Sequence, residues 1–188
     1  MASTGFTLAT AGTSIDTGPS NNPWNNPGNI TADDNVDATS AFGSLSTSDS
    51  LLAAGFGFSI PAGSTIDGIE VKYERWREEP GLGGPTPTSA TVQLANAGSV
   101  IGDTKEDLTD WPDSRTVTTV GSSSDVWGAA LTADIVNSAT FGPRIFVVWP
   151  NALGTTETAN VDYVQVNVHY TAPVGPPVGT LALMGCGR

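Results

Sequence analysis

The residues that could act as acids, bases or nucleophiles are few and form no known catalytic motif. His169 is the only histidine and shares one side of an alternating segment with Gln165 and Asn167. A catalytic triad needs a nucleophile, a base and an orienting acid, and the sequence has no G-x-S-x-G nucleophile turn. We therefore interpret His169 as a surface residue of a strand, and we predict no catalytic residues and no enzyme activity.

Four glutamates near the middle of the chain, Glu70, Glu74, Glu78 and Glu79, could supply the carboxylate pair of a glycosidase. Glu70 and Glu74 lie on the same side of an alternating segment and are interleaved with Lys72. Charges on an exposed strand also prevent edge-to-edge aggregation. We favour this protective interpretation over a hydrolase.

An acidic segment resembles the opening of a calcium-binding loop, with Asp33, Asn35 and Asp37 at alternate positions. An EF-hand loop has glycine at its sixth position and glutamate at its twelfth, whereas this sequence has Ala38 and Ser44 there. The EF-hand interpretation therefore fails. Two alternatives stay open: a Ca²⁺ site built from loop carboxylates, and an acidic solvated turn. We favour the turn and predict no cofactor.

Five tryptophans could either fill the core or form a platform for sugar rings. In a β-sandwich such residues usually close the ends of the core, with the indole N–H bonded to a partner. We therefore expect core positions for Trp24, Trp76, Trp111, Trp127 and Trp149.

The elements that must position these residues are strands. Glycine, proline and β-branched residues are abundant, and apolar residues at helical spacing are nearly absent. Short segments separated by turn residues predict strands at 38–45, 53–60, 66–77, 88–95, 98–103, 115–121, 142–149 and 160–171. One helical turn is expected over 131–138, with Thr132 as its N-cap. The pattern predicts an all-β protein, an antiparallel β-sandwich of jelly-roll or immunoglobulin-like type.

The stretch GFGFSIPAGSTIDGIEVKYERW, residues 55–76, has the pattern of two strands joined by a turn at 59–64. Its second half alternates Ile69, Val71 and Tyr73 with charged residues. Such alternation indicates one buried and one solvated face. We expect a hairpin whose role is packing and display.

The chain divides into three parts by composition: an arm at 1–20, a sandwich domain at 21–171, and a Pro/Gly linker with an apolar tail at 172–188. For the first part, a frayed terminus and a strand laid against a neighbour stay open. The tail either contacts a partner or folds back onto its own domain. The predicted partner-binding residues of both ends are Phe6, Leu8, Leu181, Leu183 and Met184.

Charge and segment analysis excludes several classes of partner. Seven basic and nineteen acidic residues give a net charge of −12, which disfavours nucleic acid and anionic membranes. No apolar run is long enough to span a bilayer. The single cysteine, Cys186, cannot form an internal disulfide. The sequence shows no signal peptide, so we expect synthesis in a cytoplasm.

Several motifs together resemble a β-sandwich module of tailed-bacteriophage virion proteins. They are W-x-N-P-x-N-I-x-x-D-D from Trp24, G-F-x-F-S-I-P-x-G-S-T-I-x-G-I-E-V from Gly55, D-V-W-G from Asp125, and V-D-Y-V-x-V-x-V-x-Y from Val161. The resemblance covers the sandwich domain and carries no catalytic residues.

The resemblance implies a structural component of a virion, assembled in the host cytoplasm. A capsid decoration protein that binds the major capsid protein or another virion protein is the expected role, with a head fibre or tail-associated protein as related alternatives. Such proteins bind many lattice positions as homo-oligomers, and a trimer is expected. The alternative from another class is a glycan-binding or host-adhesion module, with loop aromatics and Ca²⁺ as aids to binding.

Overall fold

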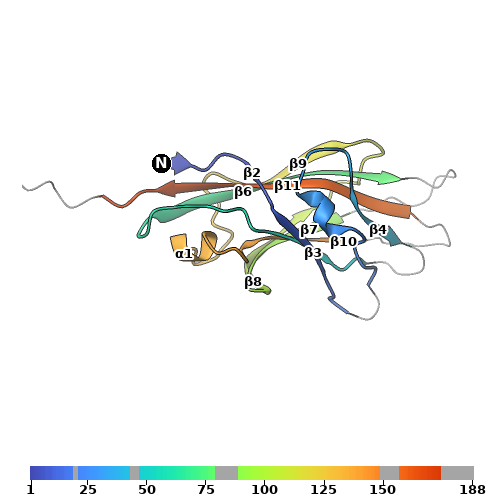
Figure 1. The fold of residues 1–188 in the computed structure, drawn as a ribbon, viewed down its shortest axis with the longest axis horizontal. Helices are drawn as coiled ribbons and strands as arrows, with labels where there is room; N and C mark the ends of the chain where they lie inside the picture. Colours follow the sequence, from blue (N-terminus) through green and yellow to red (C-terminus); the bar gives the residue numbers. More distant parts are fainter. Residues whose placement is uncertain (19–20, 43–46, 79–88, 149–156, 175–188) are drawn as a thin grey trace, which may run out of the picture.

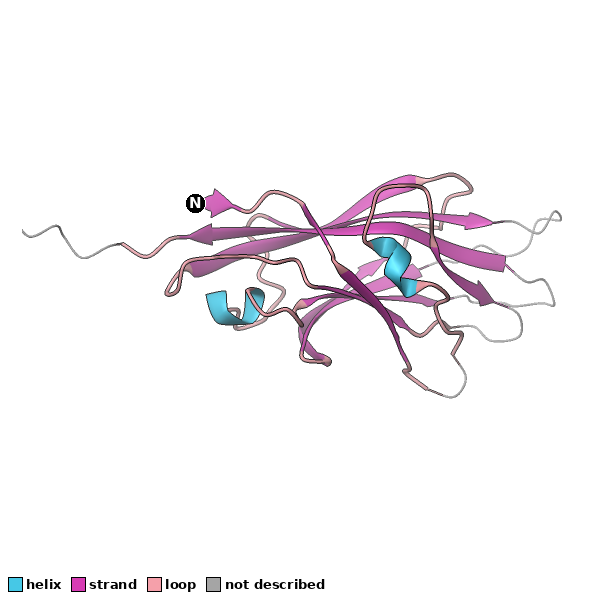
Figure 2. Ribbon diagram, viewed as in Figure 1, coloured by secondary structure: helices cyan, strands magenta, loops and turns pink. Residues whose placement is uncertain are grey.

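The computed structural model consists of two antiparallel β-sheets with a shared core between them (Figure 1). It describes residues 1–18, 21–42, 47–78, 89–148 and 157–174. The predicted all-β antiparallel sandwich is therefore confirmed. Strands dominate the described chain, as Figure 2 shows.

The first sheet has the strand order β1-β11-β6-β9, and β2 and β4 also pair with β11. Its strands are β1 (Ala2–Ser3), β2 (Thr7–Leu8), β4 (Ala38–Phe42), β6 (Thr65–Glu78), β9 (Thr116–Ser122) and β11 (Glu157–Thr171). The second sheet has the order β3-β5-β10-β7-β8. Its strands are β3 (Ala11–Ile15), β5 (Ser50–Ala54), β7 (Ser89–Asn96), β8 (Ser99–Asp107) and β10 (Gly142–Val148).

The long pair β6–β11 forms the centre of the first sheet. The apolar side chains that alternate along both strands are buried, and the half-buried Glu70, Lys72 and Gln165 lie between them on the other side of the sheet. The register shifts at two places, between His169 and Tyr170 and between Val161 and Val164; at the second, Val161 pairs with Arg75 and Val164 pairs with Tyr73. Asp162 and Tyr163 of β11 therefore lie opposite the single residue Glu74 of β6. This is a β-bulge, which changes the direction in which the side chains point.

Tryptophans close the core as expected. Trp24, Trp111 and Trp127 are buried. The indole N–H of Trp24 donates to the backbone carbonyl of Asp49 at 2.8 Å. Trp76 is only half-buried, and Trp149 lies outside the described residues. The core prediction is thus confirmed for three of the five tryptophans.

The predicted hairpin is wrong. β5 ends at Ala54, whereas a strand was expected over 53–60, because Gly55 and Gly57 take positive φ angles of 76° and 68°. β5 lies in the second sheet and β6 in the first. The turn at 59–64 therefore carries the chain from one sheet to the other, and β6 pairs with β9 and β11 instead.

The N-terminal segment was expected to form an extended arm outside the sandwich. Instead, residues 1–15 contribute three strands to the two sheets. β1 and β2 pair with β11, and β3 pairs with β5. β11 is fifteen residues long, and β1, β2 and β4 satisfy its free edge in succession. Of the two interpretations of this segment, a frayed terminus and a strand laid against a neighbour, the strand is confirmed. The strands that it pairs with belong to the same chain.

Helices are short. The predicted turn is α1 (Ala133–Val136), and the Thr132 hydroxyl accepts from the Ile135 N–H at 3.2 Å, which confirms the N-cap. A 3-10 turn, η1, spans Pro27–Ile30, and its N-cap residue Asn26 has a left-handed backbone. Within the described chain, neither helix has the length or apolar character that crossing a membrane requires.

Candidate functional site

The outward side of β6 and β11 is a polar face made of hydrogen-bonding side chains. We call Glu70, Lys72, Asn167 and His169 the polar face. The His169 Nε2 atom lies 2.7 Å from a carboxylate oxygen of Glu70, and the Asn167 amide donates to the same oxygen at 3.0 Å. His169 lies in β11, as expected, but its side chain is half-buried rather than at the surface. The absence of a catalytic role for this histidine stays a prediction.

The predicted partner-binding residues of the N-terminal segment lie against this face. The Lys72 ammonium sits 3.7 Å from the centre of the Phe6 ring, a cation–π contact. Leu8 pairs with Gln165 in the β2–β11 register. Both side chains are half-buried. Their role toward a partner stays a prediction, and Leu181, Leu183 and Met184 lie outside the described residues.

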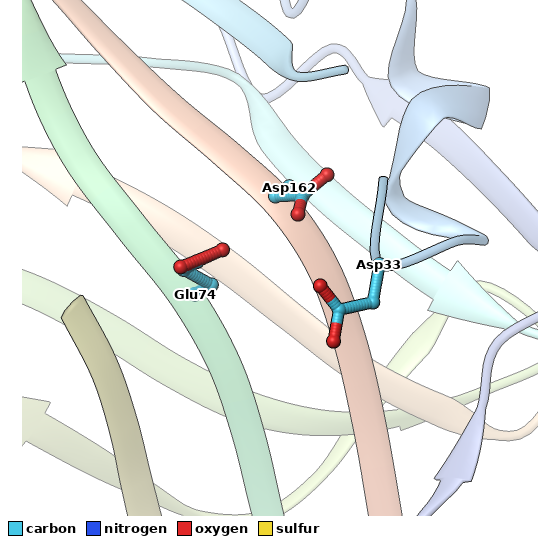
Figure 3. Close-up of side chains that lie close together, drawn as sticks. All are labelled: Asp33, Glu74 and Asp162. Carbon is cyan, nitrogen blue, oxygen red and sulfur yellow. The ribbon is translucent and has the colours of Figure 1, made fainter. Parts of the chain in front are cut away.

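Three carboxylates converge beside the polar face (Figure 3). Asp33 comes from the loop after η1, Glu74 from β6 and Asp162 from β11. One oxygen of each lies within 4.8 Å of the others. Asp162 reaches this position because it occupies the β-bulge opposite Glu74. We call Asp33, Glu74 and Asp162 the carboxylate cluster.

The acidic segment predicted from sequence is divided between two roles. Asp33 joins the carboxylate cluster. The backbone N–H of Asn35 donates to Asp162 Oδ2 at 3.2 Å, so its contribution is a main-chain one. Asp37 binds Arg115 through two guanidinium nitrogens at 2.9 and 2.7 Å. The three residues therefore do not form one ligand set.

Arg115 is mainly committed to Asp37. Its guanidinium also donates to the backbone carbonyl of Asn35 at 3.1 Å and lies 5.3 Å from the ring centre of Trp76. It reaches Glu74 and Asp162 only at 3.8 Å. Such contacts are longer than charge-assisted hydrogen bonds, so this cation neutralises the carboxylate cluster only in part.

Electrostatics in the cluster disfavour the fully ionised state. Burial raises the pKa of Glu74, and the positive charge of Arg115 offsets this only in part. Burial likewise raises the pKa of Asp162 against the opposing effects of the Asn35 N–H and Arg115. The neighbouring carboxylates add to this effect, because like charges at short distance disfavour the ionised form.

A cavity of about 420 Å³ lies elsewhere, between the 62–66 turn and α1. Its lining comes from residues 62–66 and 131–134, and Asp134 is the only ionisable side chain among them. It therefore lacks the carboxylate pair that glycoside hydrolysis uses. Among the described residues, no aromatic side chain lines it either.

Sequence reasoning missed Glu74 and Asp162 as partners of Asp33. One signal was available: the apolar positions step directly from Tyr163 to Val164, which breaks the alternation. A break of this kind marks a bulge, and the residue beside it is acidic.

Comparisons with known proteins place the chain in no family. No family model matches, and no curated protein matches. Solved structures with a similar arrangement include a CBM4 module, with 10% identity over 88% of this chain and 95% of that one, and a TM-score of 0.44. A cyclase from Fischerella sp. TAU shows 9% identity over 89% of each chain, with a TM-score of 0.48.

A third similar structure is the N-terminal cellulose-binding domain of Cellulomonas fimi β-1,4-glucanase C. It shows 9% identity over 92% of this chain and 91% of that one, with a TM-score of 0.38. At such identities and scores the similarities say nothing about function. The sandwich itself is established by the strand pairing.

Proposed function

We propose that this chain is a non-catalytic accessory protein of a virion, a capsid decoration protein that binds and stabilises a phage head. The observation that supports this proposal is the position of the chain ends. Ala2 pairs with Tyr170 and Ser3 with His169, so the first strand and the end of the last strand lie together. In Figure 1, β1 and the end of β11 share one end of the sandwich. We call this end the terminal pole.

The terminal pole suits attachment. The segment from residue 172 onward starts there, and its sequence carries Leu181, Leu183 and Met184 behind a Pro/Gly-rich linker. Linkers of this composition are extended. Many copies that each add a small contact bind a symmetric lattice through avidity. We propose that the tail contacts the capsid or a sister subunit, and that the assembled form is a trimer.

The test is co-sedimentation with capsids that lack the protein. A variant with Leu181→Ser, Leu183→Ser and Met184→Ser removes the apolar tail contacts. The matched control is Leu108→Ser, because Leu108 is a 71% exposed leucine at the end of β8. We expect wild type and control to saturate the particles and the tail variant to bind at least tenfold more weakly. Equal occupancy of all three would refute anchoring by the tail, and no binding by wild type would refute decoration.

A second candidate is binding of a surface glycan, which the polar face favours. Glu70 and His169 are partly exposed and hydrogen-bond each other beside the buried Asn167, and the half-buried Trp76 lies beyond them on the same strand as Glu70. Sugar hydroxyls are recognised by such groups, with aromatic rings below the sugar. A glycan array probed with wild type, Glu70→Ala and the exposed control Asp110→Ala tests it. If the Glu70→Ala variant keeps the glycan-array signal of wild type, the polar face is not the glycan-binding site.

A further inference from the structure

We infer that Asp33, Glu74 and Asp162 form a binding site for a divalent cation, and that their chemistry selects Ca²⁺. Three carboxylates offer hard oxygen ligands, which Ca²⁺ prefers. Ca²⁺–oxygen distances of about 2.4 Å place ligands on opposite sides of the ion about 4.8 Å apart. The cluster's oxygens all lie within 4.8 Å of one another, so one ion can contact all three.

An unsatisfied buried atom points to a missing ligand. Asp162 is 0% exposed, and its Oδ1 atom has no hydrogen-bond partner among the described residues. A buried carboxylate oxygen without a donor is costly. Its other oxygen, Oδ2, does accept from Asn35. The side chain therefore has one fixed oxygen and one oxygen left for a cation.

The charge balance agrees. Asp37 and Arg115 form a bidentate pair whose charges cancel. Arg115 approaches Glu74 and Asp162 no closer than 3.8 Å. Within the described residues, the three cluster carboxylates are thus left without a cation in direct hydrogen-bond contact. A divalent ion would neutralise most of this excess, and buried charges require such pairing.

The cluster also has an entrance. Asp33 is exposed, Glu74 is half-buried and Asp162 is buried, so an ion can enter from the Asp33 side and keep water ligands there. The three ligands come from a loop and from two different strands. Binding would therefore tie the loop after η1 to the β6–β11 pair, and the ion would act as a structural cross-link.

The experiment measures thermal unfolding and calorimetric binding with Ca²⁺ alone as the probe. The full chain is treated with a chelator, dialysed, and titrated with CaCl₂ or MgCl₂. Asp33→Asn and Glu74→Gln each remove one ligand without a large change in shape. Asp110→Asn and Glu106→Gln are matched controls, because both residues are exposed and lie outside the cluster.

At Ca²⁺ concentrations about 100-fold above Kd, we expect the wild-type midpoint temperature to rise by roughly 5–10 °C. Calorimetry should give one Ca²⁺ per chain. Both controls should behave like wild type, and both cluster variants should lose at least tenfold in affinity. An absent Ca²⁺ shift in wild type, or an unchanged shift in Asp33→Asn and Glu74→Gln, would overturn the site. An equal response to Mg²⁺ would overturn the selection of Ca²⁺.

Discussion

Replacement of Trp127 tests how the D-V-W-G motif is anchored to β6 of the first sheet. Trp127 is 0% exposed, and its indole N–H donates to the backbone carbonyl of Ile69 at 3.0 Å. Trp127→Phe keeps an aromatic ring but deletes this donor. The lost hydrogen bond costs about 1 kcal/mol, and the unfilled volume adds about 1–2 kcal/mol. Trp127→Ala should cost about 3–5 kcal/mol.

Urea unfolding measures both values, and Trp76→Phe is the matched control. Trp76 also donates its indole N–H, to a side-chain oxygen of Asp37 at 3.2 Å, but it is only half-buried. The control should therefore cost less than about 1 kcal/mol, because solvent can replace the donor. A Trp127→Phe variant within about 0.5 kcal/mol of wild type would refute the claim that this indole supports the core.

Three further substitutions probe other contacts. Gly142→Ala places a methyl group against a backbone carbonyl of β5, so we expect urea unfolding to show a loss of about 1–3 kcal/mol. Asn137→Ala removes an amide that donates to the Ile60 carbonyl and accepts from the Ile60 N–H, each at 2.9 Å; the same assay should show a loss of about 1–3 kcal/mol. Although burial opposes it, the hydrogen bond to Lys105 lowers the pKa of Asp125 below its ordinary 3.8. Asp125→Asn should therefore cost about 1 kcal/mol at pH 7, and this difference should disappear as pH falls from about 3.8 through the lowered pKa.

The strands of the sandwich were predictable where the period of two extends over many residues. β6 and β11 alternate along most of their length, so both were located to within a few residues. β1 and β2 contain two residues each, and a two-residue strand has no period to detect. Their positions depend on the free edge of β11, which is a tertiary property. The sequence therefore suggested a loose arm where the chain forms strands.

The carboxylate cluster could not be predicted from spacing along the chain. Asp33, Asn35 and Asp37 looked like a ligand set because metal loops place ligands at alternate positions. The fold instead turns Asp37 toward Arg115 and brings Glu74 and Asp162 to Asp33. Those two residues are remote in sequence and meet through the β6–β11 register and its bulge. The proximity of Glu74 and Asp162 depends on how β6 and β11 pair, which residue spacing along the chain does not reveal.

The carboxylate cluster and the terminal pole are distant sites on the same strands, so the two proposals stand separately. β6 begins at Thr65 beside Thr171, and Glu74 lies nine residues further along. At about 3.3 Å per residue, this places roughly 30 Å between the cluster and the terminal pole. Loss of Ca²⁺ binding should then lower the stability of the folded domain without removing any contact at the terminal pole. A defect in particle binding caused by the apolar tail should, for the same reason, leave the Ca²⁺ response intact.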